Sequence, residues 1–98
     1  MQPSLRPGVS RTNRIVIGRE RTISFMGDEA RTYATPSMIL DIEHTCRELI
    51  LEHAGAGEDS VGMEIAVKHL APTLMGMTVE VTGRVTSVDG RKIGFEVT

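Results

Sequence analysis

The sequence predicts a small α+β domain in which one long helix packs on an antiparallel sheet. A strong helix signal begins at Thr35 and stops at Gly55, and the apolar period then changes from helical to alternating. Two further β-branched runs follow toward the C-terminus. The chain has 98 residues, 40% of them hydrophobic, which is enough for one domain with an aliphatic core.

The first part of the chain is predicted to contain an arm and a strand. Residues 1–13 carry prolines and a glycine without periodicity and are predicted as an N-terminal arm, which leaves residues 14–98 as the domain. Residues 14–17 form a β-branched run that predicts a first strand, with an extension toward Phe25.

Thr35 and Pro36 predict the start of the helix, with a hydroxyl at the N-cap and proline at the first helical position. Gly55 predicts its end after about 18 residues. The predicted apolar stripe consists of Ile39, Ile42, Cys46, Leu49, Ile50 and His53.

Glu43 lies at the edge of this stripe, within about 40° of its nearest members. Asp41, Glu48 and Glu52 cluster on the opposite face. Because a carboxylate beside an apolar stripe needs an ionic or hydrogen-bonding partner, His69 is the candidate partner of Glu43.

Three strands are predicted after the helix. Residues 60–70 alternate, with Val61, Met63, Ile65, Val67 and His69 on one face. Residues 77–87 and 91–97 predict a hairpin. A three-residue loop at 88–90 pairs Val85 with Ile93 and Gly83 with Phe95, whose ring then covers the glycine.

Composition argues against several functions. The net charge is -2, which gives no general reason to expect nucleic-acid binding. The histidines and the single cysteine, Cys46, lack the usual metal-ligand spacings, and Cys46 is predicted to be an inert core residue. No apolar run is long enough for a membrane span, and the cysteine usage fits the reducing cytoplasm.

Thr35, Glu43 and His69 are the residue types of an acyl-transfer site. Each also has a structural interpretation: an N-cap for Thr35, a carboxylate that reaches solvent for Glu43, and a core or rim histidine for His69. The purely structural hypothesis predicts that a neutral residue at position 43 raises stability.

A family resemblance rests on these residues and the motifs around them. The motifs are Tyr33-Ala34-Thr35-Pro36, Glu43 eight residues after the threonine, Ser60-Val61-Gly62, the run 67–73 with Gly76-Met77-Thr78, and 88–91. Together they resemble the fluoroacetyl-CoA thioesterase-type branch of the hot-dog superfamily, over residues 5–97. The resemblance implies a homodimer, an acyl-CoA substrate and no separate cofactor. It also implies Thr35, Glu43 and His69 as the catalytic set.

The expected function is therefore hydrolysis of a small acyl-CoA thioester, with backbone N–H groups near Gly62 or the helix start binding the oxyanion. The resemblance implies an aromatic pair that forms a lid over the fluorinated acyl group in the fluoroacetyl-specific enzyme. Residues 25–32 contain no such pair, so fluoroacetyl-CoA is not the expected substrate. The resemblance also implies a further strand after Val97, which this chain lacks. The alternatives are a non-catalytic hot-dog module that binds acyl-CoA or dimerises, and a hydratase or dehydratase.

Overall fold

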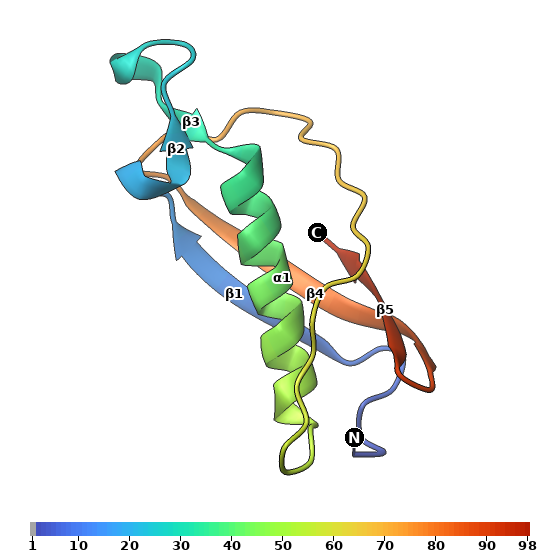
Figure 1. The fold of residues 1–98 in the computed structure, drawn as a ribbon. Helices are drawn as coiled ribbons and strands as arrows, with labels where there is room; N and C mark the ends of the chain where they lie inside the picture. Colours follow the sequence, from blue (N-terminus) through green and yellow to red (C-terminus); the bar gives the residue numbers. More distant parts are fainter. Residues whose placement is uncertain (1) are drawn as a thin grey trace.

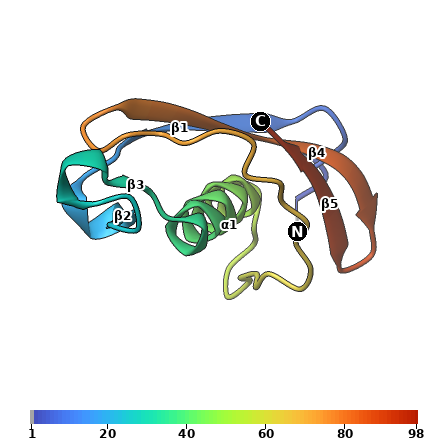
Figure 2. The ribbon, with the colours of Figure 1, turned by 90° about the horizontal axis from the view of Figure 1, so that it is seen from above.

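The computed structural model describes residues 2–98 as one long helix lying across a curved antiparallel sheet (Figures 1 and 2). This arrangement confirms the predicted α+β class. A three-stranded sheet has the order β1-β4-β5, and β2 pairs with β3 in a separate two-stranded ladder. The elements are β1 (Ser10–Val16), η1 (Arg19–Arg21), β2 (Thr22–Ile23), η2 (Asp28–Ala30), β3 (Thr32–Tyr33), α1 (Thr35–Glu52), β4 (Thr78–Asp89) and β5 (Lys92–Val97).

Helix α1 has the predicted extent of 18 residues, Thr35–Glu52. The predicted N-cap is wrong by one residue, because Ala34 is the N-cap and no side-chain hydrogen bond caps the helix. Thr35 is already helical, with Pro36 in the first turn. The Thr35 hydroxyl therefore does not cap the helix.

The core forms where α1, β4 and the N-terminal segment meet. Leu5, Leu49 and Val85 make one buried cluster, with Ile93 and Phe95 packed against it. Burying each aliphatic side chain contributes roughly 1.5–3 kcal/mol. Strand β1 begins at Ser10, before the predicted start, so the segment expected to be an arm supplies both a strand start and a core residue.

The acids expected on the far side of α1 face β1. Asp41 is buried, with 5% of its surface exposed. Glu48 lies 2.8 Å from Arg11 Nη2, and Glu52 also pairs with Arg11. The helix therefore contacts β1 through charged and polar side chains. The angular position of these acids around the helix does not predict that contact.

The β4-β5 hairpin has a different register from the predicted one. Asp89 pairs with Lys92 around a two-residue turn in which Gly90 has φ +59°. Val85 pairs with Phe95, and the register shifts by a bulge between Val85 and Ser87. The extra residue returns Ile93 and Phe95 to a half-buried position, which a regular two-residue hairpin does not achieve. Phe95 still lies beside Gly83, as predicted.

The strand predicted at residues 60–70 is not formed. Residues 58–70 have no regular secondary structure, and 61–70 are exposed. This segment runs alongside α1 and returns to β4 (Figure 1). Alternating sequence is typical of a strand, but within residues 2–98 no backbone group of 61–70 finds a backbone hydrogen-bond partner. The alternating pattern predicted a strand, but it contains no information on whether a neighbouring strand is present to pair with it.

Candidate active site

Thr35 and His69 meet at the start of α1. The Thr35 hydroxyl and His69 Nδ1 lie 2.8 Å apart and form a hydrogen bond, although both side chains are exposed. If the hydroxyl is the donor, the imidazole proton is on Nε2, and if Nδ1–H is the donor, Nε2 becomes a free base. In both cases the hydrogen bond fixes the ring and leaves Nε2 available.

Glu43 and Gly62 form a second close pair, farther along α1. A methyl group on Gly62 would lie 3.2 Å from the carboxyl carbon and Oε1 of Glu43. The absence of a side chain at Gly62 therefore lets the chain pass directly over this carboxylate. Glu43 itself is exposed and not pressed into the core.

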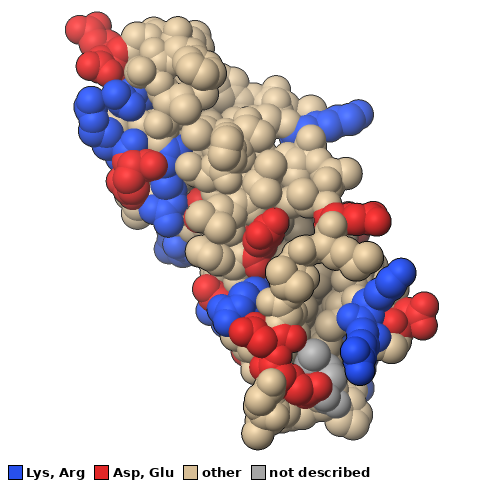
Figure 3. Space-filling view, in the orientation of Figure 1, with Lys and Arg blue, Asp and Glu red and all other residues tan. Residues whose placement is uncertain are grey.

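A groove of about 1130 Å³ connects these pairs. One wall is α1, the second is the 60–71 segment, and the floor comes from β4 and β5. Glu43, Gly62 and His69 line it together with apolar side chains such as Ile42 and Phe95. The face over the first half of α1 and the segment beside it has a broad area without Lys, Arg, Asp or Glu (Figure 3), which suits an apolar ligand group.

Three of the four predicted site residues, Glu43, Gly62 and His69, line this groove, and Thr35 reaches it through its hydrogen bond to His69. The four residues do not form one hydrogen-bonded set. Thr35 and Glu43 are eight residues apart, which is about 12 Å along a helix axis. Within residues 2–98 no hydrogen bond or ion pair connects Glu43 to His69, the partner expected for it.

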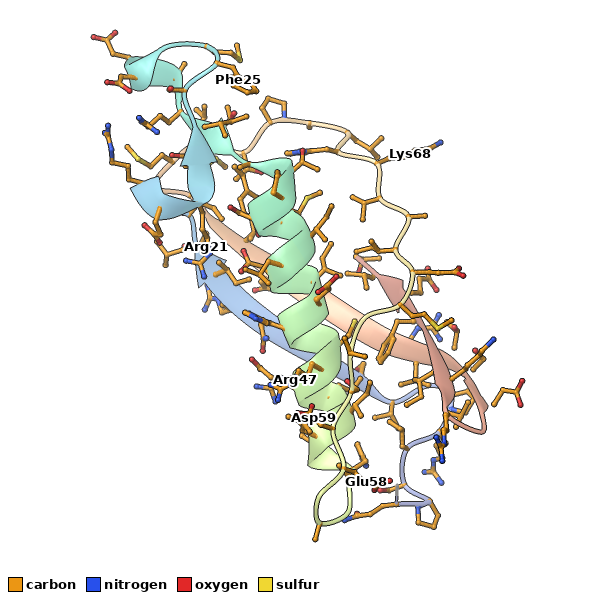
Figure 4. The ribbon with its side chains drawn as sticks, viewed as in Figure 1. Arg21, Phe25, Arg47, Glu58, Asp59 and Lys68 are labelled. Atoms are coloured by element: carbon orange, nitrogen blue, oxygen red, sulfur yellow. The ribbon has the colours of Figure 1, made fainter. Side chains whose placement is uncertain are left out.

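An ion pair holds the beginning of the 60–71 segment against α1. Arg47 Nε and Nη2 each lie 2.9 Å from an oxygen of Asp59 (Figure 4). This pairing and the Ser60 N–H lower the pKa of Asp59. Farther along the segment, Lys68 points away from α1. The arginine thus anchors the segment just before Gly62.

Cys46 and the remaining histidines lie outside the two pairs. The Cys46 sulfur packs over Gly83, and burial raises the pKa of its thiol, which disfavours the reactive thiolate. His53 accepts or donates a 2.6 Å hydrogen bond with Ser4 Oγ. In the part of the chain that the structure describes, no group of three His, Cys, Asp or Glu residues is arranged to hold a metal ion. No described helix is both long and apolar enough to cross a membrane.

Sequence reasoning missed a buried polar cluster formed by Asp41, Tyr33 and Arg21. The Tyr33 hydroxyl donates to Asp41 Oδ2, and Arg21 Nε lies 3.1 Å from the same oxygen. Burial, followed by the hydrogen bond to Asp41, raises the pKa of Tyr33. Two features of the sequence could have indicated this cluster. Tyr33 precedes Asp41 by eight residues, and arginines precede the start of the helix.

Replacing Gly62 with alanine is expected to lower turnover by about tenfold with little effect on folding. The new methyl meets the flexible end of Glu43, which can move aside, so the free energy of unfolding changes by no more than ~0.5 kcal/mol. Thiol release and thermal unfolding of the same preparation measure both effects. Unchanged turnover would show that the placement of Glu43 beside Gly62 is unimportant.

Comparison with known proteins identifies relatives along nearly the whole chain. Residues 17–98 match the family model described as fluoroacetyl-CoA-specific thioesterase. The chain is 30% identical over 104 residues to the fluoroacetyl-CoA thioesterase of Streptantibioticus cattleyicolor, and the match covers 99% of this chain and 75% of that protein. These matches confirm the family resemblance.

Solved structures agree with that result. A structure of the fluoroacetyl-CoA thioesterase superposes with a TM-score of 0.85 at 30% identity, covering 95% of this chain and 74% of that one. A Thermus thermophilus thioesterase superfamily member gives a TM-score of 0.87 at 30% identity, covering 99% and 72%. Another structure holds a mutant of the fluoroacetyl-CoA-specific thioesterase with fluoroacetate and CoA. The predicted hot-dog fold is confirmed.

Proposed function

This chain belongs to the fluoroacetyl-CoA-specific thioesterase family, and from that membership and the groove geometry we propose that it hydrolyses the thioester of a small acyl-CoA. The observation that carries the proposal is the Thr35–His69 hydrogen bond in a groove that also contains Glu43. CoA is then part of the substrate, and the reaction needs no additional cofactor. A cytoplasmic location belongs to the same proposal.

Glu43 either attacks the thioester carbonyl to form an acyl-enzyme anhydride or removes a proton from the attacking water. In both routes water is consumed, the carbon–sulfur bond breaks, and a carboxylate and a thiol are released. His69 delivers the proton that the departing thiolate needs. The 2.8 Å contact supports a role for Thr35 in orienting the imidazole.

Gly62 is proposed to bind the developing oxyanion through its backbone N–H. Within residues 2–98 this N–H forms no backbone hydrogen bond, so it is available to a substrate oxygen. It also lies beside the Glu43 carboxylate, where the carbonyl carbon must be placed for attack.

The acyl group is proposed to be small and different from fluoroacetyl. Phe25 lies at the tip of the loop after β2, with 90% of its surface exposed, and residues 26–32 contain no second aromatic residue (Figure 4). The relative's printed name specifies fluoroacetyl-CoA for that protein. This chain offers no aromatic pair that would enclose a fluorinated acyl group.

The separation of the two residue pairs favours a second candidate, a non-catalytic module that binds acyl-CoA. Glu43 and His69 make no direct contact in the described chain, and a binding protein needs none. A hydratase or dehydratase would use the same groove on the same fold. Release of thiol, binding without release, and hydration of an enoyl-CoA are the results that separate these functions.

The test is free-thiol release from a panel of short, branched and aryl acyl-CoA esters. We expect turnover of at least one short ester and a marked preference within the panel. Enoyl-CoA hydration and equilibrium binding are measured on the same preparation. Binding without any thiol release from a folded protein would overturn the thioesterase proposal in favour of the binding module.

We also propose that the chain is a homodimer in which residues 63–70 of two copies pair as strands, which leaves the Gly62 N–H to the substrate. Met63, Ile65 and Val67 alternate along this segment, and 76%, 45% and 38% of their surfaces are exposed. Their backbone groups form no backbone hydrogen bonds within residues 2–98. A second copy supplies both a covering surface and the missing partners.

Ile65→Lys is expected to convert the dimer to a monomer, since it places a charge in the paired apolar row. Ala66→Lys is the matched control, because it adds the same charge one residue away on the alternate face of the extended segment. Sedimentation equilibrium over a range of concentrations measures the effect. Equal dissociation constants for the two variants would argue against pairing through this segment.

A further inference from the structure

Asp41 is a buried carboxylate that the proposed reaction does not use. Only 5% of its surface is exposed, and it lies within the second turn of α1. It accepts hydrogen bonds from the Tyr33 hydroxyl and from Arg21, whose Nε and Nη2 lie 3.1 and 3.4 Å from its two oxygens. A buried carboxylate persists only when such partners compensate its lost hydration.

This cluster joins three separate parts of the chain at the start of α1. The Arg21 carbonyl accepts a 2.8 Å hydrogen bond from Ala34 N–H, and Tyr33 N–H donates a 2.7 Å hydrogen bond to the Thr73 carbonyl. Thr32 and Leu74 form an isolated bridge next to that contact. Arg21 approaches from the side of β1 and β2 (Figure 4). The Tyr33 side chain thus binds α1 through Asp41, while the backbone N–H groups of Tyr33 and Ala34 bind the segments at Thr73 and Arg21.

Both members of the Thr35–His69 hydrogen bond lie next to these attachments. Thr35 follows Tyr33 by two residues, and His69 precedes Thr73 by four. Between His69 and Thr73, the chain has no regular structure that would hold the imidazole by itself. The position of Thr35 relative to His69 is therefore set largely by where Tyr33 holds the helix start and the 73–74 backbone.

We infer that Tyr33 and Asp41 are positioning residues, which hold Thr35 against His69 through the buried Tyr33–Asp41 hydrogen bond. The inference deepens the proposed thioesterase function and, for its kinetic consequence, rests on it. Neither residue is assigned contact with substrate. Their effect is on the 2.8 Å contact between the hydroxyl and Nδ1.

Tyr33→Phe is the main test because it removes only the phenolic oxygen. Long-range ¹H–¹⁵N spectra of the folded protein report the His69 Nδ1 shift, with Thr35→Val as the reference for a lost hydrogen bond. We expect Tyr33→Phe to move that shift toward the Thr35→Val value. We also expect kcat to fall by about tenfold or more, with KM changed less than twofold.

Asp41→Asn is the second variant, and it keeps the shape of the acceptor while it weakens the hydrogen bond and the ion pair. Arg84→Gln is the control: it removes the exposed 2.7 Å contact with Glu96 in the β4–β5 hairpin and is expected to change neither readout. All variants are measured at a temperature at which each is folded. If Tyr33→Phe does not fold, the same shift and kcat comparison with Asp41→Asn decides the question.

The His69 shift and the kinetic measurements test different claims. A wild-type protein that releases no thiol would remove the proposed function, yet the His69 shift would still test positioning. A variant that loses stability but retains the wild-type His69 shift and kcat would overturn the inference, because the cluster would then stabilise the fold without placing the site. A shifted Nδ1 signal with reduced kcat supports it.

Discussion

Glu43→Gln is expected to lower kcat by at least about 100-fold, because a neutral amide neither attacks a thioester nor accepts a proton from water. Glutamine has nearly the same shape, so it preserves the contact with Gly62. Substrate affinity should change much less than kcat. Thiol release under saturating and subsaturating substrate separates the two effects.

Stability should be almost unchanged by the same substitution. The sequence suggested a carboxylate pressed against an apolar stripe, and its removal would then raise stability. The structure has Glu43 exposed in the groove, so we expect a change within ~0.5 kcal/mol in the free energy of unfolding. Glu29→Gln, at an exposed position outside the groove, is the charge-matched control. Full activity of Glu43→Gln would remove Glu43 from the mechanism.

Local signals were sufficient to predict α1 and most of the sheet. Proline in the first turn and a glycine beyond the last turn set the limits of the helix, and both signals act within a few residues. The β-branched runs gave the approximate extents of β4 and β5 for the same reason. Such signals do not depend on what packs against the element, so they can be predicted from the sequence.

The errors occurred where an element depends on a distant neighbour. The hairpin register depends on a bulge at residues 85–87, which returns Phe95 to the helix side, and no turn residue indicates it. Residues 60–70 have a strand pattern but lack a partner within the described chain. Asp41 is buried because Arg21 and Tyr33 approach it from other segments. Helical periodicity contains none of this information.

The candidate site likewise has features set by local sequence and features set by distant parts of the chain. The spacing of Thr35 and Glu43 along one helix is a local property, and it can be predicted from the sequence. The contact of His69 with Thr35 depends on the path of an irregular segment, which periodicity described as a regular strand. The residue types predicted the chemistry. The pairing of Thr35 with His69 in place of Glu43 with His69 required the three-dimensional path.

His69→Ala is expected to lower kcat by at least about 100-fold, because the leaving thiolate loses its proton donor. The side chain is exposed and contributes one hydrogen bond, so folding should be retained. Exogenous imidazole should restore part of the activity, because the vacated position is open to solvent. His53→Ala, which removes a comparable histidine–hydroxyl hydrogen bond at Ser4, is the matched control and should leave turnover unchanged.

Thr35→Val separates orientation from proton transfer at the same position. It removes the hydroxyl that fixes His69 but leaves the imidazole, so a loss smaller than that of His69→Ala is expected, about tenfold. Thr35→Ser retains the hydroxyl and should recover most of the activity. Equal losses for Thr35→Val and His69→Ala would instead indicate that the threonine hydroxyl takes part in the chemical step. The ratio of the activities of these two variants therefore distinguishes a threonine that orients the imidazole from one that reacts.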